Sequence, residues 1–274
     1  MTFIETKDGT KLFYKDWGNG SKPVVLVHGW CINCDSWEYV MNDLPNRGLR
    51  CIAYDQRGCG RSAQSWNGYD YNTLADDLAA VLEHLDLREA TLVGHSMGSG
   101  VVTRYLTKYG GKRVSEIVFV SGTTPFLLKT PDNPQGIDAS FFEESLAAIK
   151  KDRAGYVGKI ALPFFGIEKP DEKISQEMID WGVALTLQAS PRAATEMLRA
   201  CFESDQREEV KKITVPTLII HSDQDDSSPL EITAKRTHEL LPNSQLKIYE
   251  NSSHGLYITE SQRLCDDIAA FIQK

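Results

Sequence analysis

A serine held between two glycines is the residue whose setting points most directly to chemistry. Positions 90–100 read ATLVGHSMGSG, so an apolar run leads into Ser96, which is boxed by Gly94 and Gly98. The G-x-S-x-G pattern has a mechanical meaning where a strand turns sharply into a helix. There the turn lifts the serine hydroxyl above the sheet, and glycines avoid collisions across it. An inert serine in a glycine-rich turn is the alternative, but the flanking strand and helix patterns favour a nucleophile.

A serine hydroxyl attacks only with the help of a general base, which a third group must orient. In this architecture both partners follow the serine in the chain, the acid first and the histidine second. His254, in NSSHGL, falls between the last expected strand and the last expected helix. His238 lies inside an expected helix and reads as a surface residue, while His221 and His84 lie inside a strand and a helix, where packing is expected. We therefore predict His254 as the base.

The acid is expected directly after the strand pattern VPTLIIHSD, where three aspartates compete. Asp223 is closest to the strand, and Asp225 and Asp226 follow it. Asp225 lies four residues before Pro229, which is expected in the first turn of the next helix. We predict Asp225 as the acid and keep Asp226 as the alternative, because spacing alone does not separate them.

Acyl transfer at Ser96 also requires N–H donors for the negative charge that develops on the carbonyl oxygen. One is expected from Met97, which follows the serine at the positive end of the next helix. The other is expected from Trp30, which follows Gly29 in the loop after the strand pattern PVVLVHG. The ring of Trp30 is expected to pack against the substrate pocket.

These residues fall at the ends of expected strands that alternate with expected helices. Strands are predicted around a turn at Asp8-Gly9 and over 23–29, 49–55, 90–96, 115–122, 215–223 and 245–251; helices are predicted over 36–46, 73–85, 101–109, 230–241 and 258–273. The alternation predicts an α/β fold with a mostly parallel central sheet flanked by helices. Ligands of such sheets bind outside the carboxyl ends of the strands, which is where the candidate residues lie.

The alternation stops between residues 123 and 212, where aromatic-rich helical patterns replace it. We predict an inserted helical cap over 123–212 on a core made of 1–122 and 213–274. Its aromatic side chains are expected to divide between the interior of the cap and the substrate pocket. The candidates for contact with substrate, besides Trp30, are Phe126, Phe164, Phe165 and Trp181.

Composition excludes several other classes of protein. The 274 residues carry a net charge of -8, which disfavours a nucleic-acid partner. No apolar run reaches the roughly 18 to 20 residues of a membrane span, and the first residues show no signal-peptide pattern, so a cytoplasmic protein without membrane contact is expected. Its six cysteines are then expected as reduced thiols. Cys31 and Cys34 form a C-x-x-C pair that lacks both a second zinc half-site and a thioredoxin-like context.

The chain resembles the α/β-hydrolases and, more narrowly, the bacterial cofactor-free haloperoxidases and their sister aryl esterases, also called perhydrolases. The resemblance covers nearly the whole chain and rests on DGTKLFYKDWG, VHGW, DSWE, DQRGCGRS, ADDLAAVLEHLDL, GHSMGSG, TRY, LLKTPDNPQG, VPTLIIHSDQD and LKIYENSSHGL. It places a catalytic triad on Ser96, Asp225 and His254 and oxyanion donors on Trp30 and Met97. It implies ester hydrolysis without metal or organic cofactor. Its members often associate into homo-oligomers, but the sequence shows no decisive patch for association and leaves the oligomeric state open.

Some members of that family also form peracids from a carboxylic acid and hydrogen peroxide, and the peracid then oxidises halide. Such members usually carry proline directly after the oxyanion residue and two apolar residues in the acid loop. This chain has Cys31 and the pair Ser227 and Ser228 at those places. The missing proline favours a plain esterase, whereas the serine pair indicates a more polar side of the pocket and keeps Asp226 open as the acid or as a substrate contact. The cap aromatics indicate small to medium esters, aryl or short-acyl, with lactones as further candidates. Perhydrolysis is the alternative, and a ligand receptor on a hydrolase fold is the third hypothesis.

Overall fold

The computed structural model describes residues 2–168 and 174–273, and in these residues eight strands form one sheet. The strands are β1 (Phe3–Glu5), β2 (Lys11–Trp17), β3 (Lys22–Val27), β4 (Leu49–Tyr54), β5 (Ala90–His95), β6 (Val114–Val120), β7 (Thr217–Ser222) and β8 (Gln245–Tyr249). Their order across the sheet is β1-β2-β4-β3-β5-β6-β7-β8. β1 and β2 pair antiparallel with each other, and β2 pairs antiparallel with β4. All other neighbours are parallel, which confirms the predicted mostly parallel sheet.

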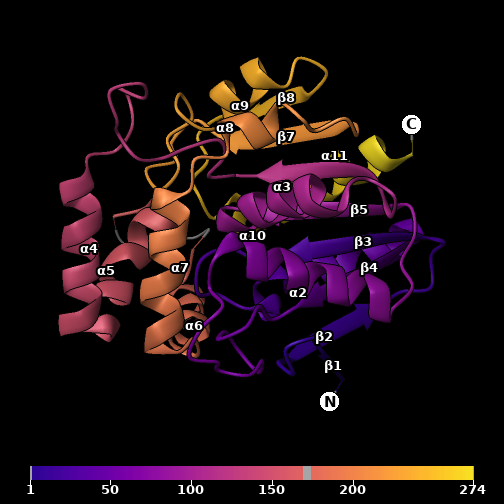
Figure 1. The fold of residues 1–274 in the computed structure, drawn as a ribbon, viewed down its shortest axis with the longest axis horizontal. Helices are drawn as coiled ribbons and strands as arrows, with labels where there is room; N and C mark the ends of the chain where they lie inside the picture. The colour runs from indigo at the N-terminus through magenta and orange to yellow at the C-terminus, as the bar shows by residue number, and fades with distance from the viewer. Residues whose placement is uncertain (1, 169–173, 274) are drawn as a thin grey trace.

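Helices cover both faces of the sheet, which explains why the central strands are apolar along their whole length. Successive side chains of a strand point to opposite faces. In β3, Val25 and Val27 pack in the same cluster as α2 (Tyr71–His84) and α3 (Met97–Tyr109). Val24 and Leu26 pack in the cluster of α1 (Glu38–Asp43) and α11 (Ser261–Ile272). Figure 1 shows α2 and α3 lying in front of the strands.

Four helices between β6 and β7 stand together beside the carboxyl ends of the parallel strands (Figure 1). We call them the cap helices: α4 (Ala139–Lys151), α5 (Arg153–Phe165), α6 (Gln176–Leu187) and α7 (Pro191–Glu203). α8 (Arg207–Val210) follows them and leads back to β7. The cap helices touch the loops of the core, since the Ser190 N–H donates to the Gly58 carbonyl at 2.7 Å and Gly255 N–H to the Phe164 carbonyl at 2.8 Å. The proposed boundaries at 123 and 212 stay a prediction.

Several helices differ in extent from their sequence patterns. The single helix expected over 36–46 is divided into a 3₁₀ turn at Cys34–Trp37, α1, and a second 3₁₀ turn at Leu44–Arg47. Pro45 lies in the first turn of that last piece, and Gly48 ends it in the left-handed conformation with φ 82°. Similarly, the last helix is divided into α10 (Leu256–Thr259) and α11, and the helix expected over 230–241 is only α9 (Ala234–Leu240).

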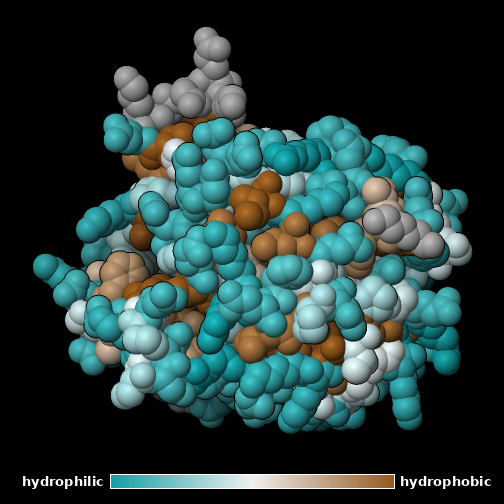
Figure 2. All heavy atoms as spheres, turned by 90° about the horizontal axis from the view of Figure 1, so that it is seen from above, coloured by the Kyte–Doolittle hydropathy of each residue, from teal (hydrophilic) through white to brown (hydrophobic). Residues whose placement is uncertain are grey.

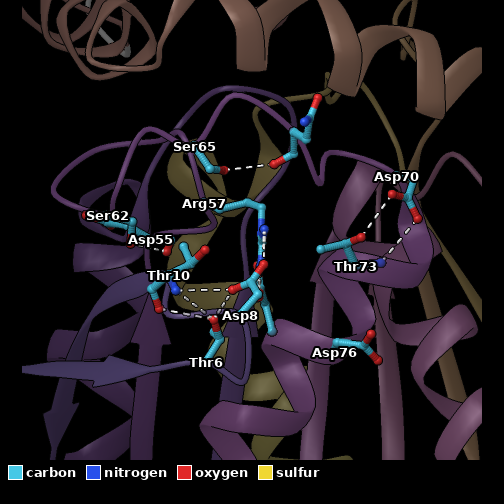
Figure 3. Close-up of polar contacts among 12 residues, drawn as sticks. Thr6, Asp8, Thr10, Asp55, Arg57, Ser62, Ser65, Asp70, Thr73 and Asp76 are labelled. Carbon is cyan, nitrogen blue, oxygen red and sulfur yellow. Dashed lines mark hydrogen bonds and ion pairs between the residues drawn. The ribbon is translucent and has the colours of Figure 1, made fainter.

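A buried arginine joins three separate segments of the core (Figure 3). Arg57, in the loop after β4, donates to both carboxylate oxygens of Asp77 on α2, at 2.7 and 2.6 Å. Its remaining nitrogen lies 2.9 Å from Asp8 in the β1–β2 turn. Burial raises the pKa of Asp77 to about 6 in spite of the arginine, so the carboxyl group is ionised at neutral pH. Through Asp77 and Asp8, Arg57 therefore joins α2 and the β1–β2 turn to the loop after β4.

The surface over α9 and β8 is mostly hydrophilic, with hydrophobic residues in separate patches (Figure 2). β8 lies at the edge of the sheet, and its Ile248 is 36% exposed. In the described ranges, no helix has both the length and the apolar character needed to cross a lipid bilayer.

Candidate active site

Ser96 stands on the turn between β5 and α3 in a backbone conformation that side chains rarely adopt. Its φ is 51° and its ψ is -124°, and the residue is 7% exposed. A Cβ atom on Gly94 would lie 2.7 Å from the Gly98 carbonyl carbon, and one on Gly98 would lie 2.4 Å from the Val27 carbonyl oxygen. These distances confirm the steric reason expected for the two glycines. The strained serine is the mark of a nucleophile elbow.

His254 and Asp225 meet although 28 residues separate them in the chain. Nδ1 of His254 lies 2.8 Å from Oδ2 and 3.0 Å from Oδ1 of Asp225. The N–H groups of Ser227 and Ser228 both donate to Asp225 Oδ1, at 3.0 and 2.7 Å. Asp225 is buried, whereas Asp226 is exposed, as is Asp223. Of the three competing aspartates, the structure therefore brings only Asp225 to His254.

The surroundings of Asp225 favour its ionised form. Burial by itself would raise the pKa of this carboxyl, but the neighbouring His254 and the N–H donors of the loop hold the pKa below its ordinary value. An ionised carboxylate only accepts hydrogen bonds, so Nδ1 of His254 carries the hydrogen. Nε2 is then the nitrogen available to accept a proton, which is the tautomer that a general base for Ser96 requires.

The two predicted oxyanion donors both lie beside Ser96. Met97 is the first residue of α3 and is fully buried. The loop that carries Trp30 approaches the serine closely, since a Cβ on Gly29 would lie 2.9 Å from Ser96 Cβ. Among the residues that the structure describes, neither the Trp30 nor the Met97 N–H has a hydrogen-bond acceptor. Both groups are thus available to bind an oxyanion.

The residue after Trp30 holds the loop in a tight turn. The N–H of Ile32 donates to the Trp30 carbonyl at 2.8 Å, which closes a γ-turn centred on Cys31. Cys31 has a φ of 55° and is 1% exposed. Asp55, at the end of β4, anchors the same loop, because its side chain accepts from the Cys34 N–H at 2.8 Å. Sequence reasoning gave no role to Asp55; its position at a strand end was the available signal.

The aromatic candidates for substrate contact occupy different places. Phe164 lies against the base, with its ring centroid 5.6 Å from that of His254. Phe165 is 5% exposed and packs edge-on against Phe164. Both rings crowd Gly255, the residue after the base. The structure therefore brings the end of α5 directly to the proposed site.

The other candidates have neighbours outside the triad. The Trp30 ring packs edge-on against Tyr156 of α5, and its Nε1 donates to the Ala194 carbonyl at 2.9 Å. Trp181 packs edge-on against Tyr39 of α1, at the seam between cap and core. Phe126 lies under the guanidinium of Arg207, whose carbon is 5.2 Å from the ring centroid. Their contact with substrate stays a prediction.

The other three histidines weighed in the sequence lie in three different settings. His221 is fully buried, as expected for packing, but its Nε2 also lies 3.5 Å from Asp225 Oδ2. His84 is expected to pack inside a helix; it is instead exposed at the last turn of α2, where its ring lies edge-on to that of Tyr14. His238 is half-buried and bonds to the Ser244 hydroxyl.

Sequence reasoning gave no role to two buried histidines, His28 and His95, and the second of them adjoins the nucleophile. His95 stands inside the G-x-S-x-G motif, is 1% exposed, and has its ring centroid 4.9 Å from that of His254. Its place directly before Ser96 is a signal that the sequence did contain.

The cysteines are all free thiols and all buried, Cys31 and Cys34 included. Burial raises the pKa of the Cys31 thiol well above its ordinary value, which disfavours the reactive thiolate. Within the described ranges, no three His, Cys, Asp or Glu side chains are grouped so that they could hold a metal ion.

Comparison with known proteins gives the same picture at the level of the whole chain. A family model described as the alpha/beta hydrolase fold matches residues 22–261. A bifunctional esterase/perhydrolase of Acinetobacter calcoaceticus is 36% identical, over all of both chains. A bromoperoxidase structure from Bacillus anthracis matches with a TM-score of 0.95 at 35% identity, over 100% of this chain and 99% of that one. An esterase structure from Exiguobacterium antarcticum matches with a TM-score of 0.94 at 32% identity and the same coverage.

Proposed function

The chain belongs to the α/β-hydrolase fold family, within its group of non-heme haloperoxidases and esterases, and on that premise we propose that it hydrolyses carboxylic esters through an acyl-enzyme on Ser96. The family is the one that the sequence motifs resemble. The observation that carries the proposal is the buried Asp225 carboxylate at 2.8 Å from His254 Nδ1, on a molecule whose Ser96 stands on a strained elbow. The geometry supports these three residues as one triad.

The proposed reaction follows from the protonation states of the site. Ser96 Oγ attacks the ester carbonyl carbon while His254 Nε2 takes the hydroxyl proton. The carbonyl oxygen becomes an oxyanion that the N–H groups of Trp30 and Met97 bind. The intermediate collapses, the ester C–O bond breaks, and His254 returns its proton to the leaving alkoxide. Water, activated in turn by His254, then attacks the acyl-enzyme and releases the acid.

The surroundings of the base support apolar substrates. Phe164 lies against His254, and the Trp30 ring and Tyr156 form an aromatic pair at the seam between α5 and the oxyanion loop. Such rings offer apolar surface beside the reacting carbonyl. The substrates we propose are small to medium aryl or short-acyl esters, with lactones as a further class.

Peracid formation is the second candidate, because a relative over the whole chain is described as both an esterase and a perhydrolase. The γ-turn at Cys31 argues for hydrolysis as the main activity. Its φ of 55° lies far from the value near -65° at which a proline ring would fix this position. The Trp30 carbonyl already accepts from the Ile32 N–H, which leaves one of its two lone pairs for a hydrogen bond from peroxide.

The test is a panel of aryl and alkyl esters of increasing acyl size, assayed with wild type and Ser96→Ala. We expect loss of the nucleophile to lower kcat by about 10⁴-fold or more. Absence of turnover by the wild type on every ester, with tight binding of a ligand, would favour the receptor hypothesis. Undiminished turnover by Ser96→Ala would overturn the mechanism.

The same panel separates the neighbouring aspartates. Asp225→Asn removes the charge that orients His254, so we expect kcat to fall by about 10⁴-fold. Asp226→Asn alters an exposed side chain that has no hydrogen bond or ion pair with the triad among the described residues, and we expect wild-type kcat. The reverse result would assign the acid to Asp226.

A further inference from the structure

His95 occupies a closed aromatic environment directly before Ser96. It is the last residue of β5 and is 1% exposed. Its ring centroid lies 4.2 Å from that of Tyr257 and 4.9 Å from that of His254. Trp37 and Phe164 stand edge-on to it at 6.1 and 6.3 Å. The ring is therefore fixed in position by packing before any hydrogen bond is considered.

One nitrogen of this ring contacts the backbone of the proposed base. His95 Nε2 lies 3.1 Å from the carbonyl oxygen of His254. Because a carbonyl only accepts, Nε2 must carry the hydrogen and donate it. The other nitrogen, Nδ1, is buried and has no hydrogen-bond partner among the described residues. The contact with His254 is thus the one hydrogen bond that this side chain makes among the described residues.

The loop that carries His254 is held from three sides. On the cap side, the Gly255 N–H donates to the Phe164 carbonyl at 2.8 Å. On the β7 side, the Gln224 N–H donates to the Ser252 carbonyl at 3.2 Å. His95 supplies the third contact, and it alone comes from the residue next to the nucleophile. It links the position of Ser96 to the position of His254 through one side chain.

The charge state of His95 suits this place. The titratable groups around it are His254 and Tyr257 from the segment after β8, Asp225 from the loop after β7, and His28 from the end of β3. Burial lowers the pKa of His95 well below its ordinary value, and the adjacent His254 lowers it further. The ring therefore stays neutral while His254 takes up a proton. A second positive charge beside the imidazolium would oppose that step.

We propose that His95 is a positioning residue that sets the distance between Ser96 and His254 by donating a hydrogen bond to the His254 carbonyl. This inference rests on the proposed ester hydrolysis, in which proton transfer between the two residues is required. A displacement of about 1 Å between reacting groups can cost about 100-fold in rate. The effect is expected on kcat and not on KM, because the buried His95 side chain contacts the backbone of the base and acts through it.

The test compares His95→Phe and His95→Gln on an aryl acetate, with rates expressed per folded molecule from near-ultraviolet circular dichroism. Phenylalanine keeps the ring packing and loses the donor, so we expect kcat to fall by about 100-fold with KM nearly unchanged. Glutamine can place an N–H near the position of Nε2, and we expect it to recover at least tenfold of that loss, about 1.4 kcal/mol. The matched control is Tyr257→Phe, which changes a hydroxyl in the same cluster and should keep wild-type kcat.

Wild-type kcat in His95→Phe, or equal loss in the Phe and Gln variants, would overturn the inference. If His95→Phe does not fold, His95→Asn takes its place, because the shorter amide does not reach the His254 carbonyl; Asn as active as Gln would then count against the proposal. Ser96→Ala is assayed in parallel. Turnover by Ser96→Ala would remove the proposed function itself, whereas an inactive Ser96→Ala beside an active His95→Phe removes only the role of His95.

Discussion

Two residues of the site have backbone angles that side chains normally avoid: Ser96 with φ 51° and Cys31 with φ 55°. Strain of this kind persists only where the surrounding structure enforces it. At Ser96 the close approach of α3 to β3 enforces it, and at Cys31 the hydrogen bond between Ile32 and Trp30 does. Both strained residues adjoin a proposed oxyanion donor, so the strain lies where the acyl group would be held.

A proline at position 31 should change the acceptor that the enzyme uses. Cys31→Pro forces φ to about -65°, which breaks the γ-turn and frees the Trp30 carbonyl to accept a hydrogen bond from peroxide. We expect the ratio of perhydrolysis to hydrolysis to rise by about tenfold, equivalent to about 1.4 kcal/mol in relative barrier. The measurement is peracid formation from acetate and hydrogen peroxide beside aryl acetate hydrolysis.

Cys31→Gly is the control for that experiment. Glycine tolerates the positive φ and removes only the thiol, so the ratio should stay at the wild-type value. An equal rise in both variants, or none in Cys31→Pro, would refute the role given to the turn.

At the residue scale, order in the chain and one motif were enough to propose Ser96 and His254 from the sequence. Spacing alone left Asp225 and Asp226 unresolved, because the distinction depends on how the Ser227 and Ser228 N–H groups fold around one carboxylate. The positions of the aromatic candidates for substrate contact were harder to predict than those of the triad candidates. Their side chains belong to helices whose packing on the core does not follow from periodicity.

At the scale of elements, the sheet was predictable and the helix limits were not. Long apolar runs such as that of β5 can be satisfied only in a strand covered on both faces. α3, in contrast, begins at Met97 and not at the expected 101, since packing overrides the low helix propensity of Gly98 and Gly100. That difference matters for function, because it places the Met97 N–H at the first turn of the helix.

The Arg57–Asp77 pair should dominate the stability of the segment that joins α2 to the loop after β4. Asp77→Asn leaves the buried Arg57 with the half-exposed carboxylate of Asp8 as its remaining ion-pair partner among the described residues, and we expect a loss of about 3 kcal/mol in unfolding free energy at pH 7. Asp76→Asn is the matched control on the same helix. Its ion pair with Lys108 is solvent-exposed, and its loss should cost about 1 kcal/mol or less.

Denaturant unfolding of the two variants checks this prediction. Equal stability of Asp77→Asn and Asp76→Asn would contradict the view that the buried arginine network fastens these segments together.

At the scale of the whole molecule, one layered core carries the proposed chemistry and the cap helices cover it. The core follows from the alternation of strand and helix patterns. The arrangement of the cap helices could not be predicted, because contacts such as that between Ser190 and Gly58 join residues more than a hundred positions apart. The substrate range depends on those contacts, and for that reason it is the least predictable part of the function.

Three buried imidazoles should make the stability of the whole protein fall in mild acid. Burial lowers the pKa values of His28, His95 and His221 from the ordinary 6.5. Below pH 6.5 these three imidazoles bind protons in the unfolded chain, whereas in the folded protein they stay neutral until the pH reaches their lowered pKa values. The stabilisation is therefore complete above pH 6.5 and is lost as the pH falls towards the lowered values. Each histidine contributes a slope of up to about 1.4 kcal/mol per pH unit.

His221→Gln isolates one of these contributions. Between pH 7 and 5, its unfolding free energy should decline less steeply than that of the wild type, by up to about 1.4 kcal/mol per pH unit. The raised pKa of Asp77 acts in the opposite sense over part of this range, but it is common to both proteins and cancels in the difference. Parallel curves would mean that His221 is protonated equally in the folded and unfolded states.

The central claim is that Ser96 carries the acyl group during turnover. The most direct measurement is peptide mass spectrometry on enzyme quenched in acid during turnover of an aryl acetate. We expect one acetyl group, located on the peptide that contains Ser96 and absent from the Ser96→Ala protein. An acetyl group on a different residue, or active turnover that never yields an acetylated enzyme even with slowly deacylating substrates, would contradict the account.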